Sequence, residues 1–109
     1  MATAVRILRA LILAVLATAA PVAAQDRGAL VERGRTAFMA NGCHGCHTVG
    51  KMDTPIGPDL SRVGFKYREE YLERWLRDPA YLRPSAHMPK LELKESDLKA
   101  LASYLASLR

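Results

Sequence analysis

Glycine and proline interrupt the middle of this chain so often that few regular elements can form there. Five glycines fall between residues 42 and 66, and three prolines fall within residues 79–92. Glycine favours turns and proline removes a backbone donor, so both tend to end helices. Apolar residues recur at helical spacing only over residues 29–41, 67–77 and 94–108. We therefore expect a small all-α domain with three main helices and two long irregular segments.

Each predicted helix has an apolar face that would pack against a core. In the last helix, leucines are spaced by three and four residues: Leu98, Leu101, Leu105 and Leu108. The second helix has a similar group: Tyr71, Leu72, Trp75 and Leu76. The first has a looser one: Leu30, Val31, Gly34, Ala37, Phe38 and Met39. We expect Asn41-Gly42 to end the first helix and Asp78-Pro79 to end the second.

Three short helices bury little apolar surface for a domain of about 85 residues. The chain has two cysteines, which cannot supply a dense disulfide framework. Long loops in so small a domain indicate that they wrap something other than protein. A large apolar cofactor would make up the missing core.

The first 24 residues have the pattern of a secretory signal peptide. Arg6 and Arg9 supply a positive start, and 19 of the 24 residues are apolar. Small residues precede Gln25, so we expect cleavage after Ala24 and a domain spanning residues 25–109. The alternative is an uncleaved anchor, for which the 17 residues ending at Ala24 are marginal. Once the leader is cleaved, no later segment predicts stable membrane insertion.

The charge of the remaining chain excludes a nucleic-acid partner. Residues 25–109 contain 14 basic and 11 acidic residues, and the two signs are interleaved, as in Arg68-Glu69-Glu70. Nucleic-acid binding needs a concentrated basic face. We expect an ordinary solvated surface.

Both cysteines lie in the motif Cys43-His44-Gly45-Cys46-His47. The spacing Cys-x-x-Cys-His is the attachment pattern of c-type haem. Two thiols three positions apart on a helical turn can each add to one vinyl group of a single porphyrin edge. The adjacent His47 can then offer an imidazole nitrogen to the iron. The predicted cofactor is one covalently attached haem c with its iron.

Three other uses of the motif compete with haem attachment. A thiol–disulfide redox pair belongs after a buried strand in a βαβ unit, and no strand is predicted. A zinc site needs a second ligand pair, and outside the motif only His87 remains among histidines and cysteines. A disulfide between Cys43 and Cys46 would close too short a loop to stabilise the domain much.

Over residues 28–108 the chain resembles a bacterial class I monohaem cytochrome c. The residues that carry the resemblance are Gly34-x-x-x-Phe38, Cys43-x-x-Cys46-His47, Ile56-Gly57-Pro58-Asp59-Leu60, Met88-Pro89 and Leu98-x-x-Leu101-x-x-Tyr104-Leu105. The resemblance implies a small fold wrapped around one haem. It also implies that Gly34 and Phe38 pack against the last helix at Leu101, Tyr104 and Leu105.

Met88 is the expected second axial ligand of the iron. It is followed by Pro89, as the ligand methionine often is in this family, and a thioether favours ferrous iron. Met39 lies on the first helix, and Met52 is too close to His47 to reach the opposite face of the ring. The neighbouring His87 could compete, but adjacent residues of an extended loop point in opposite directions.

The resemblance gives Pro58 and Trp75 supporting roles. The Pro58 carbonyl would accept a hydrogen bond from the other nitrogen of His47, which fixes the tautomer of the ring. Trp75, with Tyr71, could line the haem or bond to a propionate, or simply belong to the core. We expect His44 to be exposed. Where the family usually caps the last helix with Ser or Thr, this chain has Lys94.

The sequence therefore predicts an exported, periplasmic one-electron carrier and not an enzyme. His47 and Met88 would stay bound to the iron in both oxidation states and leave no position for a substrate. Its partners would be redox proteins, a donor and an acceptor, with the domain acting as a monomer. The alternative is a haem c electron-transfer subunit of a larger periplasmic oxidoreductase complex.

Overall fold

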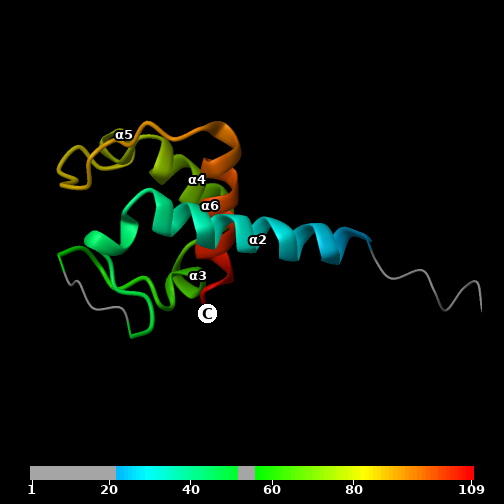
Figure 1. Cartoon of the computed structure of the whole chain (residues 1–109). Helices are drawn as coiled ribbons and strands as arrows, with labels where there is room; N and C mark the ends of the chain where they lie inside the picture. The colour runs from blue at the N-terminus through cyan, green and yellow to red at the C-terminus, as the bar shows by residue number, and fades with distance from the viewer. Residues whose placement is uncertain (1–21, 52–55) are drawn as a thin grey trace, which may run out of the picture.

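The computed structural model describes residues 22–51 and 56–109. Over these ranges the chain forms helices and no β-strand: α2 (Val22–Ala40), η1 (Cys43–Gly45), α3 (Val63–Lys66), α4 (Glu69–Arg77), α5 (Pro79–Leu82) and α6 (Glu95–Ser107). Figure 1 shows α6 in the middle of the molecule, with α2 crossing it. The prediction of a small all-α fold with three main helices is confirmed.

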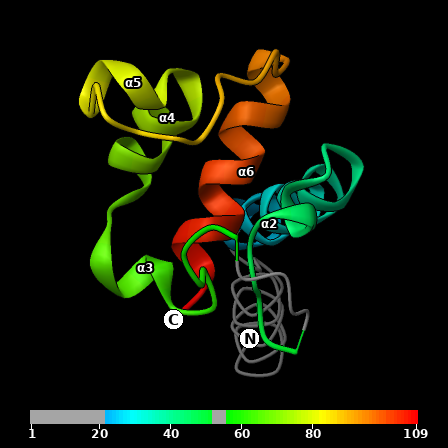
Figure 2. The same cartoon turned by 90° about the vertical axis from the view of Figure 1, so that its left-hand side faces the viewer.

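Helix α6 forms the centre of the core and packs against α2, α3 and α4. Its predicted leucine face is buried at Leu98, Leu101 and Leu105. The small residues between them, from Ala100 to Ser103, are also fully buried. Helix α6 lies between α4 and α5 on one side and α2 and η1 on the other (Figure 2). The last helix is therefore enclosed on more faces than its leucine stripe predicts.

Helix α2 crosses α6 at close range because Gly34 has no side chain. A Cβ at this position would overlap the carbonyl group of Ala100 and lie 2.6 Å from Cβ of Tyr104. One turn later, Phe38 meets Tyr104 edge to face, with ring centroids 5.7 Å apart. The predicted packing of this pair against Tyr104 is confirmed, and Ala100 is an additional contact of Gly34.

The start of the first helix was predicted seven residues too late. Helix α2 begins at Val22 and not at residue 29. Its first turns are exposed to solvent, so they carry no apolar pattern that periodicity could detect. Arg27 forms an ion pair with Glu69 that joins this extension to α4. The helix ends as expected before Gly42, which has a positive φ of 71°, whereas Met39 is 45% exposed and not part of the core.

The predicted irregular segments contain two short α-helices besides η1. Helix α3 lies within residues 42–66, where Gly64 was interpreted as a turn residue. Gly64 in fact fits against the end of α6: its N–H donates to the Leu108 carbonyl at 2.8 Å, and a Cβ would overlap the Ala106 carbonyl. Helix α5 begins directly at Pro79, because proline is compatible with the first position of a helix.

The described residues include no helix with both the length and the apolar composition needed to cross a bilayer. The predicted leader lies outside the described residues except for Val22–Ala24, which begin α2. Its cleavage after Ala24 stays a prediction.

The N-terminus of α6 lacks a side-chain cap, and this makes a stabilising substitution possible. Lys94 occupies the N-cap position in an extended conformation, and its side chain bonds to no helical N–H. The hydroxyl of a serine there could accept a hydrogen bond from a backbone N–H in the first turn of α6, where these groups have no partner within the helix. We expect Lys94→Ser to raise the free energy of unfolding by about 1 kcal/mol, measured by chemical denaturation.

Lys99→Ser is the matched control, because Lys99 is exposed in the interior of the same helix. Serine is a weaker helix former than lysine, so this change should lower stability slightly. If both substitutions shift stability in the same direction, capping does not explain the effect. The bidentate pair of Arg77 with Glu95, at 2.8 and 2.9 Å, is left intact in both variants.

Candidate functional site

The two cysteines lie on a tight turn that follows α2 directly. Gly42, in the left-handed conformation, ends the approach to η1. The Cys43 carbonyl then accepts hydrogen bonds from the N–H groups of Cys46 at 3.2 Å and His47 at 3.0 Å. This turn presents both thiols and the imidazole from five consecutive residues. Its spacing is the one on which the haem-attachment prediction depends.

The two thiols are in different surroundings and are not joined to each other. Cys43 is half-buried and packs against the core cluster, whereas Cys46 is exposed. Burial raises the pKa of the Cys43 thiol above its ordinary value, so it stays protonated at neutral pH. His44 was expected to be exposed, but it is partly buried, and its Nδ1 is enclosed without a hydrogen-bond partner. The tight turn folds this ring inwards.

The His47 ring is held by the backbone of a neighbouring loop. Its Nδ1 lies 2.8 Å from the carbonyl oxygen of Pro58. Because a carbonyl only accepts, Nδ1 carries the proton and donates it, which leaves the lone pair on Nε2 free. The structure thus contains the contact that the resemblance implied for Pro58. Two backbone bonds support it: Gly57 N–H to the Cys46 carbonyl at 2.6 Å and Leu60 N–H to the Thr48 carbonyl at 2.9 Å.

Gly57 is a site residue that sequence reasoning missed. The segment around Pro58 carries part of the family resemblance, but the sequence alone indicates no role for its glycine. A Cβ at Gly57 would lie 2.6 Å from Cε1 and 2.8 Å from Nδ1 of His47. Any larger residue would therefore push the imidazole away from the Pro58 carbonyl. The only available signal was a glycine directly before the proline.

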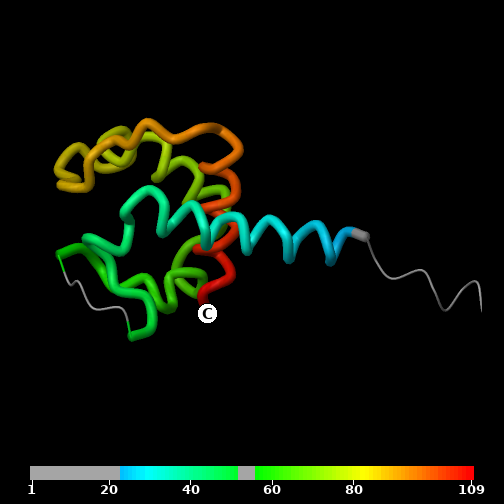
Figure 3. The backbone as a smooth tube through the Cα atoms, viewed as in Figure 1, coloured from blue at the N-terminus to red at the C-terminus, as the bar shows by residue number. Residues whose placement is uncertain are grey.

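Met88 and His87 are placed differently, as expected for adjacent residues of an extended loop. Met88 is half-buried against the core cluster, and its Sδ accepts a hydrogen bond from Trp75 Nε1 at 3.2 Å. His87 is exposed. The segment that carries them runs back from α5 to the start of α6 (Figure 3). The Trp75 N–H therefore donates its hydrogen bond to the Met88 sulfur. Its predicted bond to a haem propionate stays untested. Met52 lies outside the described residues.

The predicted site residues form two groups, each linked by a hydrogen bond. The first contains Cys43, Cys46 and His47 with Pro58, and the second contains Met88 with Trp75. The donor set is two thiols, one imidazole with a free Nε2 and one thioether. Thiols can form thioether links, and imidazole with thioether is a ligand pair suited to haem iron. The residues present therefore fit the attachment and axial ligation of a haem c.

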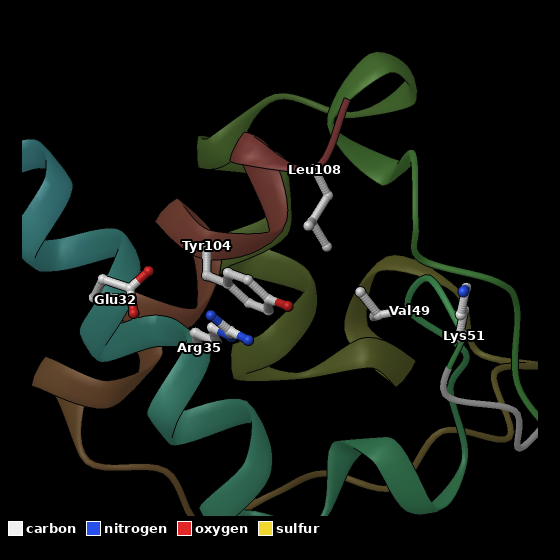
Figure 4. A pocket seen from close by; sticks show the side chains of 6 residues that line it. All are labelled: Glu32, Arg35, Val49, Lys51, Tyr104 and Leu108. Atoms are coloured by element: carbon white, nitrogen blue, oxygen red, sulfur yellow. The ribbon is translucent and has the colours of Figure 1, made fainter.

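A separate hollow of about 600 Å³ lies between α2, α6 and the loop that follows η1. Figure 4 shows Tyr104 at its centre, with Glu32 and Arg35 from α2 on one side and Val49 and Lys51 on the other. None of the predicted site residues lines it. Its walls are open and carry charges of both signs, so it is a surface depression and not the cofactor site.

Comparison with known proteins identifies the type of domain. The family model described as cytochrome c matches residues 31–109. The chain is 37% identical over 89 residues to cytochrome c oxidase subunit 2 of Alkalihalophilus pseudofirmus, a match covering 73% of this chain and 26% of that protein. It is 32% identical over 88 residues to cytochrome c oxidase subunit 2 of Bacillus sp. PS3, a match covering 67% of this chain and 25% of that protein. The chain thus spans about a quarter of the length of these relatives.

Proposed function

Because this chain belongs to the cytochrome c family, with haem c as its cofactor and electron transfer as its activity, we propose that it is an exported monohaem one-electron carrier. In this proposal Cys43 and Cys46 hold the haem covalently. His47 and Met88 are the axial ligands of the iron. Pro58 and Trp75 support these two ligands.

The observation that carries the proposal is the hydrogen bond from His47 Nδ1 to the Pro58 carbonyl at 2.8 Å. It orients the ring and leaves Nε2 as the only nitrogen able to bind a metal. Zinc or haem iron could use such an imidazole, but the thioether of Met88, half-buried against the core cluster, favours haem iron. The thioether also favours the ferrous state, which raises the reduction potential relative to a second imidazole.

Bound haem would supply a one-electron exchange between ferric and ferrous iron. The residues of the chain do the rest. Cys43 and Cys46 would prevent dissociation of the haem, His47 keeps its orientation through Pro58, and Met88 would supply the second iron ligand. With both axial positions filled by protein, no site is left for a substrate. This arrangement supports a carrier and not an enzyme.

The periplasm is the proposed location. The N-terminal segment of residues 1–24 has the charge and apolar pattern of an export signal. A periplasmic location is also consistent with the attachment of haem c outside the cytoplasm. Donor and acceptor would be redox proteins that dock weakly and transiently.

The decisive test is the intact mass and the visible spectrum of the protein purified from the periplasmic fraction. We expect a red protein whose mass equals residues 25–109 plus one haem. A mass that includes residues 1–24 would contradict cleavage. A colourless protein with two free thiols would contradict the whole assignment and favour a thiol oxidoreductase.

A second candidate function is the haem subunit of a larger redox complex. It is favoured by the two relatives, both named cytochrome c oxidase subunit 2 and both about three times as long as this chain. Size-exclusion chromatography of the periplasmic fraction separates the two proposals. A free carrier elutes at the volume of a single small domain, and a subunit co-elutes persistently with a catalytic chain.

A further inference from the structure

Three aromatic rings are stacked along one side of α4 and end at the proposed ligand Met88. The rings of Tyr67 and Tyr71 are nearly parallel, with centroids 4.6 Å apart and an angle of 13°. Tyr71 and Trp75 follow at 6.5 Å and 21°. The Trp75 N–H then bonds to Met88 Sδ. The core needs burial at these positions, but it does not need three parallel rings, each of them only half-buried.

The far end of the stack lies at a basic hollow of about 400 Å³ on the surface. We call this surface the α3 face and define it by the residues that line the hollow: Arg27, Gly64, Phe65, Lys66, Tyr67, Arg68, Glu69, Ala106 and Arg109. Lys66 Nζ lies 5.3 Å from the centre of the Tyr67 ring. The aromatic stack therefore joins a charged surface to the Met88 side of the cofactor site.

Positive charge on the α3 face is not neutralised within the domain. Its one acidic side chain, Glu69, is already bound by Arg27 and accepts a hydrogen bond from Ser103 Oγ at 2.6 Å. Across residues 22–51 and 56–109, Lys66, Arg68 and Arg109 form no ion pair. Phe65, which lines the same hollow, is 67% exposed. An apolar contact with a basic rim matches a protein partner that presents an acidic rim.

We propose that the α3 face is a docking surface for an acidic one-electron redox protein, and that Tyr67, Tyr71 and Trp75 connect this partner to the Met88 side of the site. The proposal rests on the carrier function proposed above and places the partner on a surface that includes neither Cys43 nor Cys46. One electron would pass from ferrous iron to the oxidised partner, leaving ferric iron and a partner reduced by one electron. No bond forms or breaks, and no proton moves.

An anionic membrane is the other class of partner that a basic surface could fit. The aromatic stack favours a redox protein as the partner. Binding to a lipid headgroup would not require a series of rings that ends at Met88. Electron tunnelling is faster through atoms in contact than across an empty gap. The stack supplies a series of neighbouring rings from Tyr67, which precedes α4, to Trp75 in its last turns.

The first test measures docking of the haem-loaded protein with a soluble acidic blue-copper protein, mixed in its oxidised form with the reduced cytochrome. We compare the double variant Lys66→Glu/Arg68→Glu with Lys94→Glu/Lys99→Glu, which changes the net charge equally but lies at the N-cap and in the first half of α6. At physiological ionic strength, charges more than about 8 Å from the docking area are screened. The first variant should reduce the bimolecular rate about tenfold or more, and the second should leave it unchanged.

Backbone-amide NMR shifts locate the contact independently of the rate. With both proteins reduced, we expect the blue-copper protein to shift amides of Gly64, Phe65, Lys66 and Arg68. Shifts confined to residues around Cys43 and Cys46 would overturn the proposal, as would equal rate losses in the two double variants. In either case electron transfer itself would persist, so failure here is distinct from failure of the carrier function.

The second test addresses the aromatic stack within the docked complex. Tyr71→Leu should slow electron transfer in the complex several-fold without changing the NMR footprint, whereas Tyr71→Phe keeps the ring and should behave as the wild type. Tyr81→Leu is the matched control, because Tyr81 is 84% exposed on α5 and outside the stack. An unchanged rate in Tyr71→Leu would overturn the role of the stack.

Vesicles of phosphatidylglycerol provide the remaining comparison. If Lys66→Glu/Arg68→Glu abolishes flotation with these vesicles while the rate with the blue-copper protein is unaffected, the α3 face binds lipid, and the redox-partner proposal is wrong. If the variant loses the rate with the protein and neither form floats, the proposal is supported.

Discussion

Replacing Met88 with alanine is expected to abolish the weak far-red absorption band that reports a sulfur–iron bond in the oxidised protein. It should also lower the reduction potential by about 0.1 V or more, within the roughly 0.8 V range that axial ligands cover in haem proteins. For a one-electron couple, 0.1 V corresponds to about a fifty-fold change in the ferrous-to-ferric equilibrium. Spectroscopy and redox titration of the purified protein measure both effects.

Met39→Ala is the matched control for this change, because Met39 is 45% exposed on α2 and far along the chain from the Met88 loop. It should keep the band and the potential. The open position in Met88→Ala should also let the reduced protein bind carbon monoxide, which the wild type should ignore. Survival of the band in Met88→Ala would show that another residue binds the iron, and His87→Ala would then identify or exclude its neighbour.

Replacing Gly34 with alanine is expected to lower the free energy of unfolding by about 3 kcal/mol, at the upper end of the usual cost of overpacking. The new Cβ would overlap the Ala100 carbonyl and lie 2.6 Å from Cβ of Tyr104, so α2 and α6 must separate. Because η1 follows α2 directly, this separation also displaces Cys43. Guanidinium unfolding, monitored by far-UV circular dichroism, measures the loss.

Helix α2 also contains a control position at which the same substitution should raise the free energy of unfolding. Gly28 lies in the exposed first turns of α2, and a Cβ there would meet no atom within 4 Å. Gly28→Ala should therefore raise stability by about 0.5–1 kcal/mol through helix propensity alone. If the two alanines had similar effects, close contact at Gly34 would not be what holds the two helices together.

The sequence was most informative where one chemical requirement fixes both residue type and spacing. The Cys43–His47 motif predicted a turn carrying two thiols and an imidazole, and the structure has that turn in η1. The leucine steps of residues 94–108 located α6 to within one residue at each end. Both signals are local, because a turn or a helix face depends on residues a few positions apart.

What the sequence did not reveal depends on contacts between distant segments. The role of Gly57 requires knowing that its backbone touches the His47 ring, and the role of Gly64 requires knowing that α3 meets the end of α6. The first turns of α2 face solvent and leave no periodic trace. Tyr67 belongs to no predicted apolar face, so its stacking on Tyr71 becomes visible only when α4 is built.

The contact between His47 and Pro58 bears on how fast such a site can accept or release charge. The His47 ring is held between the Pro58 carbonyl oxygen, which bonds to its Nδ1, and the backbone of Gly57. Both residues belong to one short loop that is hydrogen-bonded through its backbone to the attachment turn. An imidazole confined in this way is already in its working orientation before any partner arrives. The entropy lost by orienting the ring is therefore lost on folding and not at each reaction. Little nuclear rearrangement is then left to slow each electron transfer.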